Sequence, residues 1–162
     1  VTSEIDQRLP QNMFGFRKNK STSDALVTLL DKIRIHRSNG KKVALLALDA
    51  SAAFDTIPHQ LIIQSLKRFG AGPLMLAWSE NFLKECEYYV QIGSARSSSW
   101  HCGEAGVGQG KKFSPDYYNI GTSSQAIWCD LFESSLFADD GGDVIFGDTP
   151  EECQYRLQEA AN

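Results

Sequence analysis

Apolar residues recur every three to four positions in five segments of the chain, and this period predicts amphipathic helices. The first covers residues 21–40, where Ser21 and Asp24 have the spacing of a capping box and Gly40 is suited to end the helix. The other helices are expected at residues 55–70, 73–87, 114–126 and from 149 onward. Basic residues at the end of the first helix are typical of a solvated helix terminus.

Two segments have the patterns of strands. Residues 42–48 are nearly all apolar, which favours a strand covered on both faces, and the run ends at Asp49. Residues 134–146 predict a hairpin in which Gly141 and Gly142 supply the tight reversal. The carboxylates of the hairpin would then lie close to its turn.

A second hairpin is expected further upstream. Residues 88–92 and 97–102 are short strand-like runs separated by a turn that begins with Gly93. Helices that are mixed with hairpins favour an α+β fold, in which an antiparallel sheet has helices packed on one face.

Composition limits the architecture and the compartment. The chain has 162 residues and 42% hydrophobic content, enough for a single domain over residues 1–162. Its net charge of −4 shows no overall basic excess of the kind that would by itself indicate a nucleic-acid binder. The cysteines lack zinc-site spacing and are expected to be buried thiols in a reducing compartment: Cys86, Cys102, Cys129 and Cys153.

The sequence has no pattern of a membrane span or of a targeting leader. No apolar run approaches the roughly 20 residues of a membrane span, and no charged-then-apolar leader opens the chain. We therefore expect a soluble intracellular protein of the nucleus or cytoplasm with no membrane partner. Because the chain opens on Val1 and stops just after a helical pattern, it is expected to be a piece of a longer polypeptide.

Three aspartates follow apolar runs. Asp49 ends the first strand, and Asp139 and Asp140 follow a second run. Each alone has an ordinary interpretation as a turn residue. Only one of the adjacent pair can share the face of Asp49, and two carboxylates brought together without a partner would repel each other. A hard divalent cation such as Mg²⁺ removes that penalty, and paired ions about 3.5–4 Å apart suit phosphoryl transfer.

Four ordered motifs resemble those of reverse transcriptases of the non-LTR retrotransposon type. LALDASAAFDTIPH at residues 46–59 resembles the first catalytic motif, and FADD at residues 137–140 resembles the aromatic-x-Asp-Asp motif. GFRKNKST at residues 15–22 lies upstream, and GVGQG at residues 106–110 lies between them. The similarity covers nearly the whole chain. It implies a palm with part of the fingers, built as a palm-like antiparallel sheet.

The resemblance also implies an activity and its metal ligands. Such a palm belongs to an RNA-directed DNA polymerase, a nucleotidyltransferase that adds dNTPs to a DNA primer on an RNA template. Two Mg²⁺ or Mn²⁺ ions are expected in the active complex. By position, Asp49 and Asp139 would be the principal metal ligands, and Asp140 would be the second carboxylate of the pair.

Five further residues match substrate-binding positions of that family. The backbone at Ala50 would lie along the triphosphate, and Phe54 would be the steric gate that collides with a 2′-hydroxyl. Gln109 and Gly110 would lie near the template and the nascent base pair, where glycine permits close approach. Arg17 would contact the substrate. From the residues alone, Phe54 reads equally as a core aromatic and Arg17 as a surface cation.

The chain departs from the family pattern in the loop between the two catalytic motifs. Gly108 replaces the Pro of GVPQGS, which loosens the loop, and lysines replace the residues that follow Gly110. The resemblance also implies upstream fingers strands before Val1 and a thumb after Asn162. Because few phosphate contacts remain without them, the chain is predicted to be weak or inactive as an isolated polymerase.

Two other classes of function stay open. A domesticated, non-catalytic module would keep the palm fold for contacts with protein or nucleic acid. A hydrolytic nuclease would use the same carboxylates, but His36, His59 and His101 are dispersed and no Glu cluster lies near them in the sequence.

Overall fold

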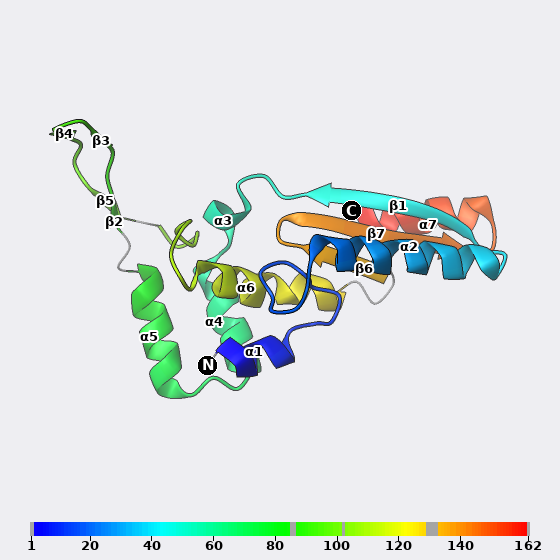
Figure 1. Cartoon of the computed structure of the whole chain (residues 1–162), viewed down its shortest axis with the longest axis horizontal. Coiled ribbons are helices and arrows are strands. Elements are labelled where there is room, and N and C mark those ends of the chain that lie inside the picture. Colours follow the sequence, from blue (N-terminus) through cyan, green and yellow to red (C-terminus); the bar gives the residue numbers. More distant parts are fainter. Residues whose placement is uncertain (1, 85–86, 102, 129–132, 162) are drawn as a thin grey trace. The chain divides into compact units, whose positions relative to one another are not determined.

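A computed structural model describes residues 2–84, 87–101, 103–128 and 133–161 of the chain (Figure 1). They form two compact units. The sheet unit comprises residues 1–51 and 123–162, and the hairpin unit comprises residues 52–122. The single domain expected over residues 1–162 stays a prediction.

In its described residues, the sheet unit contains three strands and three complete helices. Its elements are α1 (Thr2–Arg8), α2 (Thr22–Ser38), β1 (Lys42–Asp49), β6 (Glu133–Phe137), β7 (Asp140–Gly147) and α7 (Pro150–Ala161). The hairpin unit contains α3 (Ala53–Thr56), α4 (His59–Arg68), α5 (Pro73–Lys84), β2 (Glu87–Tyr88), β3 (Gln91–Ile92), β4 (Ala95–Arg96) and β5 (Trp100–His101). Helix α6 (Ser114–Trp128) begins in the hairpin unit, and its residues from 123 onward are assigned to the sheet unit.

Local signals place α2 as predicted. The Ser21 hydroxyl accepts a hydrogen bond from the Asp24 N–H at 3.2 Å, and the Asp24 carboxylate accepts one from the Ser21 N–H at 2.8 Å. This reciprocal capping box satisfies two backbone donors at the start of the helix. At the other end, Gly40 adopts a left-handed φ of 76°, and the Lys41 N–H donates to the His36 carbonyl at 3.0 Å.

The sheet is antiparallel in the order β1-β7-β6. Its ladder pairs β1 with β7 from Lys42 opposite Gly147 to Asp49 opposite Asp140. The free side of β6 is covered by the segment at residues 12–14, because Met13 forms a parallel bridge with Leu136. Among the described strands, β1 therefore has one side that is not paired with another strand.

Helices lie on both faces of this sheet. A Cβ built on Gly142 would meet Leu29 of α2 at 3.3 Å, and one built on Gly147 would meet the backbone of Cys153 in α7 at 2.9 Å. Residues five apart on a strand point to opposite faces. The α+β class and the antiparallel sheet are as expected, and the single helical face is corrected to two.

The edge position of β1 overturns one expectation. Leu45 is 50% exposed and Leu48 is 48% exposed, so the prediction of a strand covered on both faces is wrong. An apolar run indicates a strand that can be buried, but it does not say whether the strand is central. Here α2 packs across β6 and β7 as well as β1, and part of β1 stays uncovered.

The β6–β7 turn also differs from the prediction. Ala138 and Asp139 form the two-residue loop, because Phe137 pairs directly with Asp140. Gly141 and Gly142 lie inside β7, so the prediction that they supply the reversal is wrong. A Cβ at either glycine would contact leucine side chains at 3.3 Å, which indicates that these positions provide space for packing.

A buried polar pair interrupts the apolar interior of the sheet. Asp143 is opposite Ser134 of β6, and it is only 4% exposed. Within the described part of the chain, the Ser134 Oγ and the Asp143 Oδ1 have no hydrogen-bond partner. Burial lowers the pKa of Lys32, whereas the charges of Glu133 and Asp143 act to raise it. The buried carboxylate therefore remains only partly compensated.

Replacing Asp143 with Val is expected to raise the free energy of unfolding by about 1–3 kcal/mol, because the change removes an unsatisfied buried oxygen and introduces a good strand former. Chemical denaturation measures the change. Asp143→Asn, which keeps the shape and two polar atoms, is the matched control and is expected to gain less. A Val variant that is no more stable than the parent chain would contradict this prediction.

The hairpin unit contains a helical core and short ladders. α4 packs on α5, and Ile62 and Leu66 are fully buried. The Tyr117 hydroxyl donates to the Ser79 Oγ at 2.8 Å, and burial raises the pKa of Tyr117, which keeps this donor protonated. The predicted hairpin is confirmed as β2 paired with β5 and β3 paired with β4, with Cys102 outside the described residues.

Two predicted helix boundaries are corrected. The helix expected over residues 55–70 is divided into α3 and α4, because Pro58 pushes Ile57 into an extended conformation with ψ 121°. Pro58 is then the N-cap of α4 instead of part of its first turn. The helix expected to reach Glu87 ends by Lys84, and Glu87 begins β2.

The predictions about cysteine thiols and membrane spans can be compared with the structure only for the residues that it describes. Cys153 is a buried free thiol, and the other three cysteines lie outside the described residues. Within the described ranges, no helix is both long enough and apolar enough to cross a membrane.

Candidate active site

Asp49 and Asp140 lie directly opposite each other at one end of the β1–β7 ladder. The Ala50 N–H donates to the Asp139 carbonyl at 3.3 Å just beyond them. Hydrogen-bonded and non-hydrogen-bonded pairs alternate along an antiparallel ladder, so Asp49 and Asp140 form a non-hydrogen-bonded pair with Cα atoms about 4.5 Å apart. Opposed residues share a face of the sheet. The ladder thus brings together two carboxylates that are 91 positions apart in the sequence.

Asp139 occupies the turn beside this pair. It follows Ala138, whose φ of 56° is in the left-handed region that non-glycine residues rarely adopt. A positive φ at the first central residue is typical of the hairpin turns that match the twist of a sheet. The carbonyl of Asp139 is held by Ala50, so the FADD turn is attached to the residue after Asp49.

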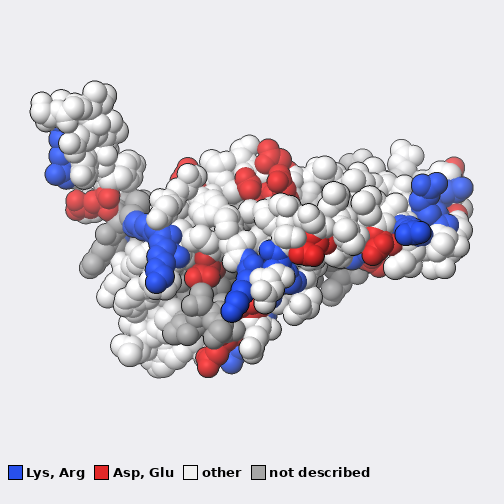
Figure 2. All heavy atoms as spheres, in the orientation of Figure 1, with Lys and Arg blue, Asp and Glu red and all other residues white. Residues whose placement is uncertain are grey.

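The electrostatics of this end of the sheet favour a cation. Asp49, Asp139 and Asp140 are all exposed. Figure 2 shows acidic side chains gathered around the end of β1 and basic side chains at the opposite end of the sheet unit. Like charges directly opposite on a sheet are destabilising, and the oxygen donors present here are those that Mg²⁺ and Mn²⁺ take.

Two carboxylates that could bind a metal ion lie opposite each other, but a cluster of three such side chains is not formed among the described residues. Among the residues that the structure describes, no group of three or more His, Cys, Asp or Glu side chains is close enough to hold a metal ion. Asp49 and Asp140 nevertheless share a face at opposed positions. Two carboxylates with water and substrate phosphates are a usual set for Mg²⁺.

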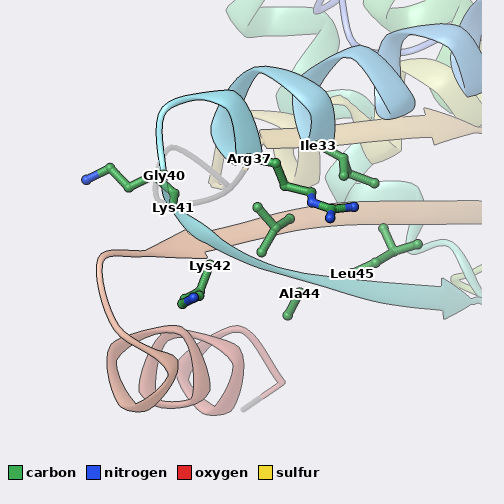
Figure 3. Close-up of a pocket in the computed structure, with 8 residues that line it drawn as sticks. Ile33, Arg37, Gly40, Lys41, Lys42, Ala44 and Leu45 are labelled. Carbon is green, nitrogen blue, oxygen red and sulfur yellow. The ribbon is translucent and has the colours of Figure 1, made fainter.

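The basic end of the sheet unit contains a separate cavity of about 520 Å³ between α2 and β1. Figure 3 shows Arg37 reaching from α2 toward β1 beside Ile33, whereas Lys41 points away from the strand. None of the described residues that line this cavity carries a carboxylate. It is therefore no candidate for binding a divalent cation.

Arg17 is buried in a network within its own unit. Its Nε donates to the Asp6 carboxylate at 2.7 Å and its Nη2 to the Asp6 carbonyl at 2.7 Å. Its Nη1 donates to the carbonyls of Pro10 at 2.6 Å and Met13 at 3.0 Å. The side chain is 4% exposed, so the surface-cation interpretation is wrong. These bonds use four of the five N–H donors of the guanidinium.

Phe54 and the GVGQG loop are in the hairpin unit. The Phe54 ring stacks on Tyr118 with centroids 4.6 Å apart, and the Phe54 carbonyl accepts a hydrogen bond from the Val107 N–H at 2.7 Å. The His59 Nε2 lies 2.7 Å from the Gly106 carbonyl. Phe54 and His59 therefore contact the first two residues of the GVGQG loop.

The rest of the loop is closed by short-range bonds. The Ser114 Oγ donates to the Gly108 carbonyl at 2.6 Å, and the Lys111 N–H donates to the same carbonyl at 3.3 Å. Gln109 is exposed, and Gly110 adopts a φ of 82°, which a β-branched or bulky residue would not tolerate. The loop presents Gln109 to solvent.

The structure thus divides the predicted site residues between the two units. Asp49, Ala50, Asp139 and Asp140 come together in the sheet unit, which also contains Arg17. Phe54, Gln109 and Gly110 belong to the hairpin unit.

Sequence reasoning missed the role of Gly15. A Cβ at this position would lie 2.3 Å from the Ala138 N, so the backbone of the GFR segment lies against the FADD turn. The glycine in the GFR motif was the only signal of this close approach.

The amino-acid sequence matches the model of a known protein family. The model for reverse transcriptase (RNA-dependent DNA polymerase) matches residues 1–162, and the chain therefore belongs to the reverse transcriptase family.

Curated relatives come from mobile elements. The RNA-directed DNA polymerase from mobile element jockey of Drosophila melanogaster is 28% identical over 118 residues, or 72% of this chain and 13% of that protein. The retrovirus-related Pol polyprotein from type-1 retrotransposable element R2 of Popillia japonica is 26% identical over 95 residues, or 59% and 16%. The transposon TX1 uncharacterized 149 kDa protein of Xenopus laevis is 28% identical over 97 residues, or 60% and 7%.

These relatives confirm the resemblance to non-LTR retrotransposon reverse transcriptases. The chain spans between 7% and 16% of the length of these three relatives.

Solved telomerase structures share the fold. The apo telomerase of Candida tropicalis, truncated from its C-terminal domain, has a TM-score of 0.67 at 11% identity and covers 97% of this chain and 33% of that one. The telomerase of Candida albicans, in complex with a TWJ fragment of telomeric RNA, has a TM-score of 0.68 at 12% identity, with 98% and 31% covered. The palm-like α+β fold is confirmed.

Proposed function

We propose that this chain is the palm core of an RNA-directed DNA polymerase that transfers nucleotides from dNTPs to a primer 3′ end by a two-metal mechanism. The observation that carries the proposal is the pairing of Asp49 with Asp140 beside the FADD turn, in a sequence whose residues 1–162 match the model of the reverse transcriptase family. An RNA template, a DNA primer and a dNTP are the proposed partners.

The proposed metal ligands are Asp49, Asp139 and Asp140. Mg²⁺ or Mn²⁺, when bound, would supply charge neutralisation at the attacking and leaving oxygens. Asp49 and Asp140 are suited to hold an ion between them because they are opposed, exposed and acidic. The turn presents Asp139 beside the same end of the ladder.

The proposed substrate contacts follow the resemblance to the reverse transcriptase family, residue by residue. The Ala50 backbone would lie along the triphosphate, next to Asp49. The Phe54 ring would act as the steric gate, supported by its stack on Tyr118, and Gln109 with Gly110 would contact the template near the nascent pair. A rigid ring suits such a gate, because selection against a 2′-hydroxyl depends on a ring that does not move aside.

A single-nucleotide incorporation assay tests the proposal. The protein is placed in excess over a DNA primer on an RNA template, with Mg²⁺ or Mn²⁺ and one dNTP at a time. We expect slow addition of the complementary dNTP alone, absent in Asp49→Asn. Low affinity is expected because a chain with a net charge of −4 has little to offer a polyanion.

Three other outcomes would contradict parts of the proposal. Robust repeated turnover would overturn the expectation that the chain is weak in isolation. No templated addition, together with intact Mn²⁺ binding at Asp49, would favour the domesticated non-catalytic module. Shortening of the primer would favour a nuclease.

A further inference from the structure

The FADD turn contains a residue at positive φ and lies against a neighbouring segment. Ala138 has a φ of 56°, and two other non-glycine residues with positive φ, Phe16 at 56° and Asn19 at 59°, follow Gly15 closely. Such conformations are unfavourable for most non-glycine residues and persist where the local turn and its surroundings impose them. The surroundings of Ala138 therefore decide where Asp139 lies.

The segment at residues 12–15 supplies those surroundings. The Phe14 N–H donates to the Leu136 carbonyl at 2.8 Å, and the Leu136 N–H donates to the Asn12 carbonyl at 2.8 Å. These two bonds attach the segment to β6 two residues before the turn. Gly15 then lies against Ala138 so closely that a Cβ would be 2.3 Å from the Ala138 N.

Arg17 is hydrogen-bonded to this segment and to residues that precede it. Its guanidinium donates four hydrogen bonds, and one of them goes to the carbonyl of Met13, the residue that forms the bridge with Leu136. The others join the segment to Pro10 and to Asp6 of α1. A planar guanidinium with several fixed donors suits this bracing, because little freedom is lost per hydrogen bond formed.

We propose that Arg17 is a positioning residue for the reaction: it holds the 12–15 segment against the FADD turn, keeps Ala138 at positive φ and thereby sets the place of Asp139 beside Asp49. This role is an alternative to the substrate contact expected from the sequence, and it is supported by four hydrogen bonds that the guanidinium donates to the chain itself. The inference rests on the proposed function for its catalytic meaning, although its structural part can be tested without metal or substrate.

The test reads the hydrogen bond between the Ala50 N–H and the Asp139 carbonyl. Amide hydrogen exchange is followed by NMR in the 162-residue chain, with Leu46 as a reference within the same ladder. Arg17→Met removes the fork and keeps an aliphatic stem. We expect exchange at Ala50 to accelerate about tenfold or more, while exchange at Leu46 changes less than about threefold. Arg34→Met, an exposed cation of α2, is the matched control and is expected to change neither.

A rescue variant separates positioning from general stability. Glycine adopts positive φ without strain, so Ala138→Gly in the Arg17→Met background is expected to restore most of the protection at Ala50. Equal acceleration at Ala50 and Leu46, unchanged exchange at Ala50, or failure of the rescue would each overturn the proposal.

A Mn²⁺ titration adds the functional readout. We expect Arg17→Met to weaken Mn²⁺ binding about tenfold and the rescue variant to recover it. If the parent chain binds no Mn²⁺, the proposed function fails while the exchange measurement still decides the role of Arg17. If Arg17→Met loses dNTP affinity with Ala50 exchange and Mn²⁺ binding unchanged, Arg17 contacts substrate and the positioning role is wrong.

Discussion

Asp49→Asn is expected to abolish Mn²⁺ and Mg²⁺ binding and, in the same protein, to raise the thermal midpoint measured without metal. Asp49 and Asp140 are directly opposed on one face, and like charges directly opposite each other destabilise a sheet. Removing one charge relieves that repulsion. With metal present the order reverses, because only the parent chain gains the free energy of ligand binding.

Isothermal titration and thermal unfolding with and without Mn²⁺ measure both effects. Asp140→Asn is expected to behave as Asp49→Asn does, and Asp139→Asn shows whether the turn carboxylate contributes a third ligand. Asp31→Asn, an exposed carboxylate of α2, is the matched control and is expected to change neither binding nor stability. Undiminished Mn²⁺ affinity in Asp49→Asn would rule out the metal site.

The sequence predicted those features of the fold that depend on neighbours along the chain. The capping box at Ser21 and Asp24 and the left-handed Gly40 set both ends of α2, and the structure confirms them. Glycine and proline act through backbone geometry over one or two residues. Signals of this kind do not require knowledge of the tertiary structure.

Features that depend on tertiary partners were predicted less well. The apolar run of β1 was taken as a buried strand, yet it is the sheet edge, because strand order is set by pairing across about 90 residues. Gly141 and Gly142 were assigned to a turn, whereas they make room for Leu136 and Leu48 of the sheet and for Leu29 of α2. Turn composition alone does not distinguish a residue that needs positive φ from one that needs space.

The candidate site shows the same division. Motif order placed Asp49 and the FADD residues in one site, and the ladder brings Asp49 and Asp140 together. The environment of Arg17 was not predictable from the sequence. Its partners are backbone carbonyls and one carboxylate, 4 to 11 residues away, and no sequence pattern identifies them. Backbone acceptors are present at every position and leave no compositional signal.

Gly15→Ala is expected to lower the free energy of unfolding by about 2–4 kcal/mol and to weaken Mn²⁺ binding. The new Cβ would lie 2.3 Å from the Ala138 N and 3.0 Å from its Cα, and both are backbone atoms that have no alternative rotamer. Either the 12–15 segment must leave β6 or the FADD turn must shift. Both movements displace Asp139 from the end of β1.

Denaturant unfolding and a Mn²⁺ titration on the same samples measure this pair of effects. Gly72→Ala is the matched control, because a Cβ there meets nothing within 4 Å and the backbone has no positive φ. That variant is expected to be neutral or slightly more stable, since alanine restricts the unfolded chain. A Gly15→Ala protein as stable as the Gly72→Ala protein would mean that the GFR segment does not press on the turn in solution. The close contact between Gly15 and Ala138 would then have no part in holding the carboxylates together.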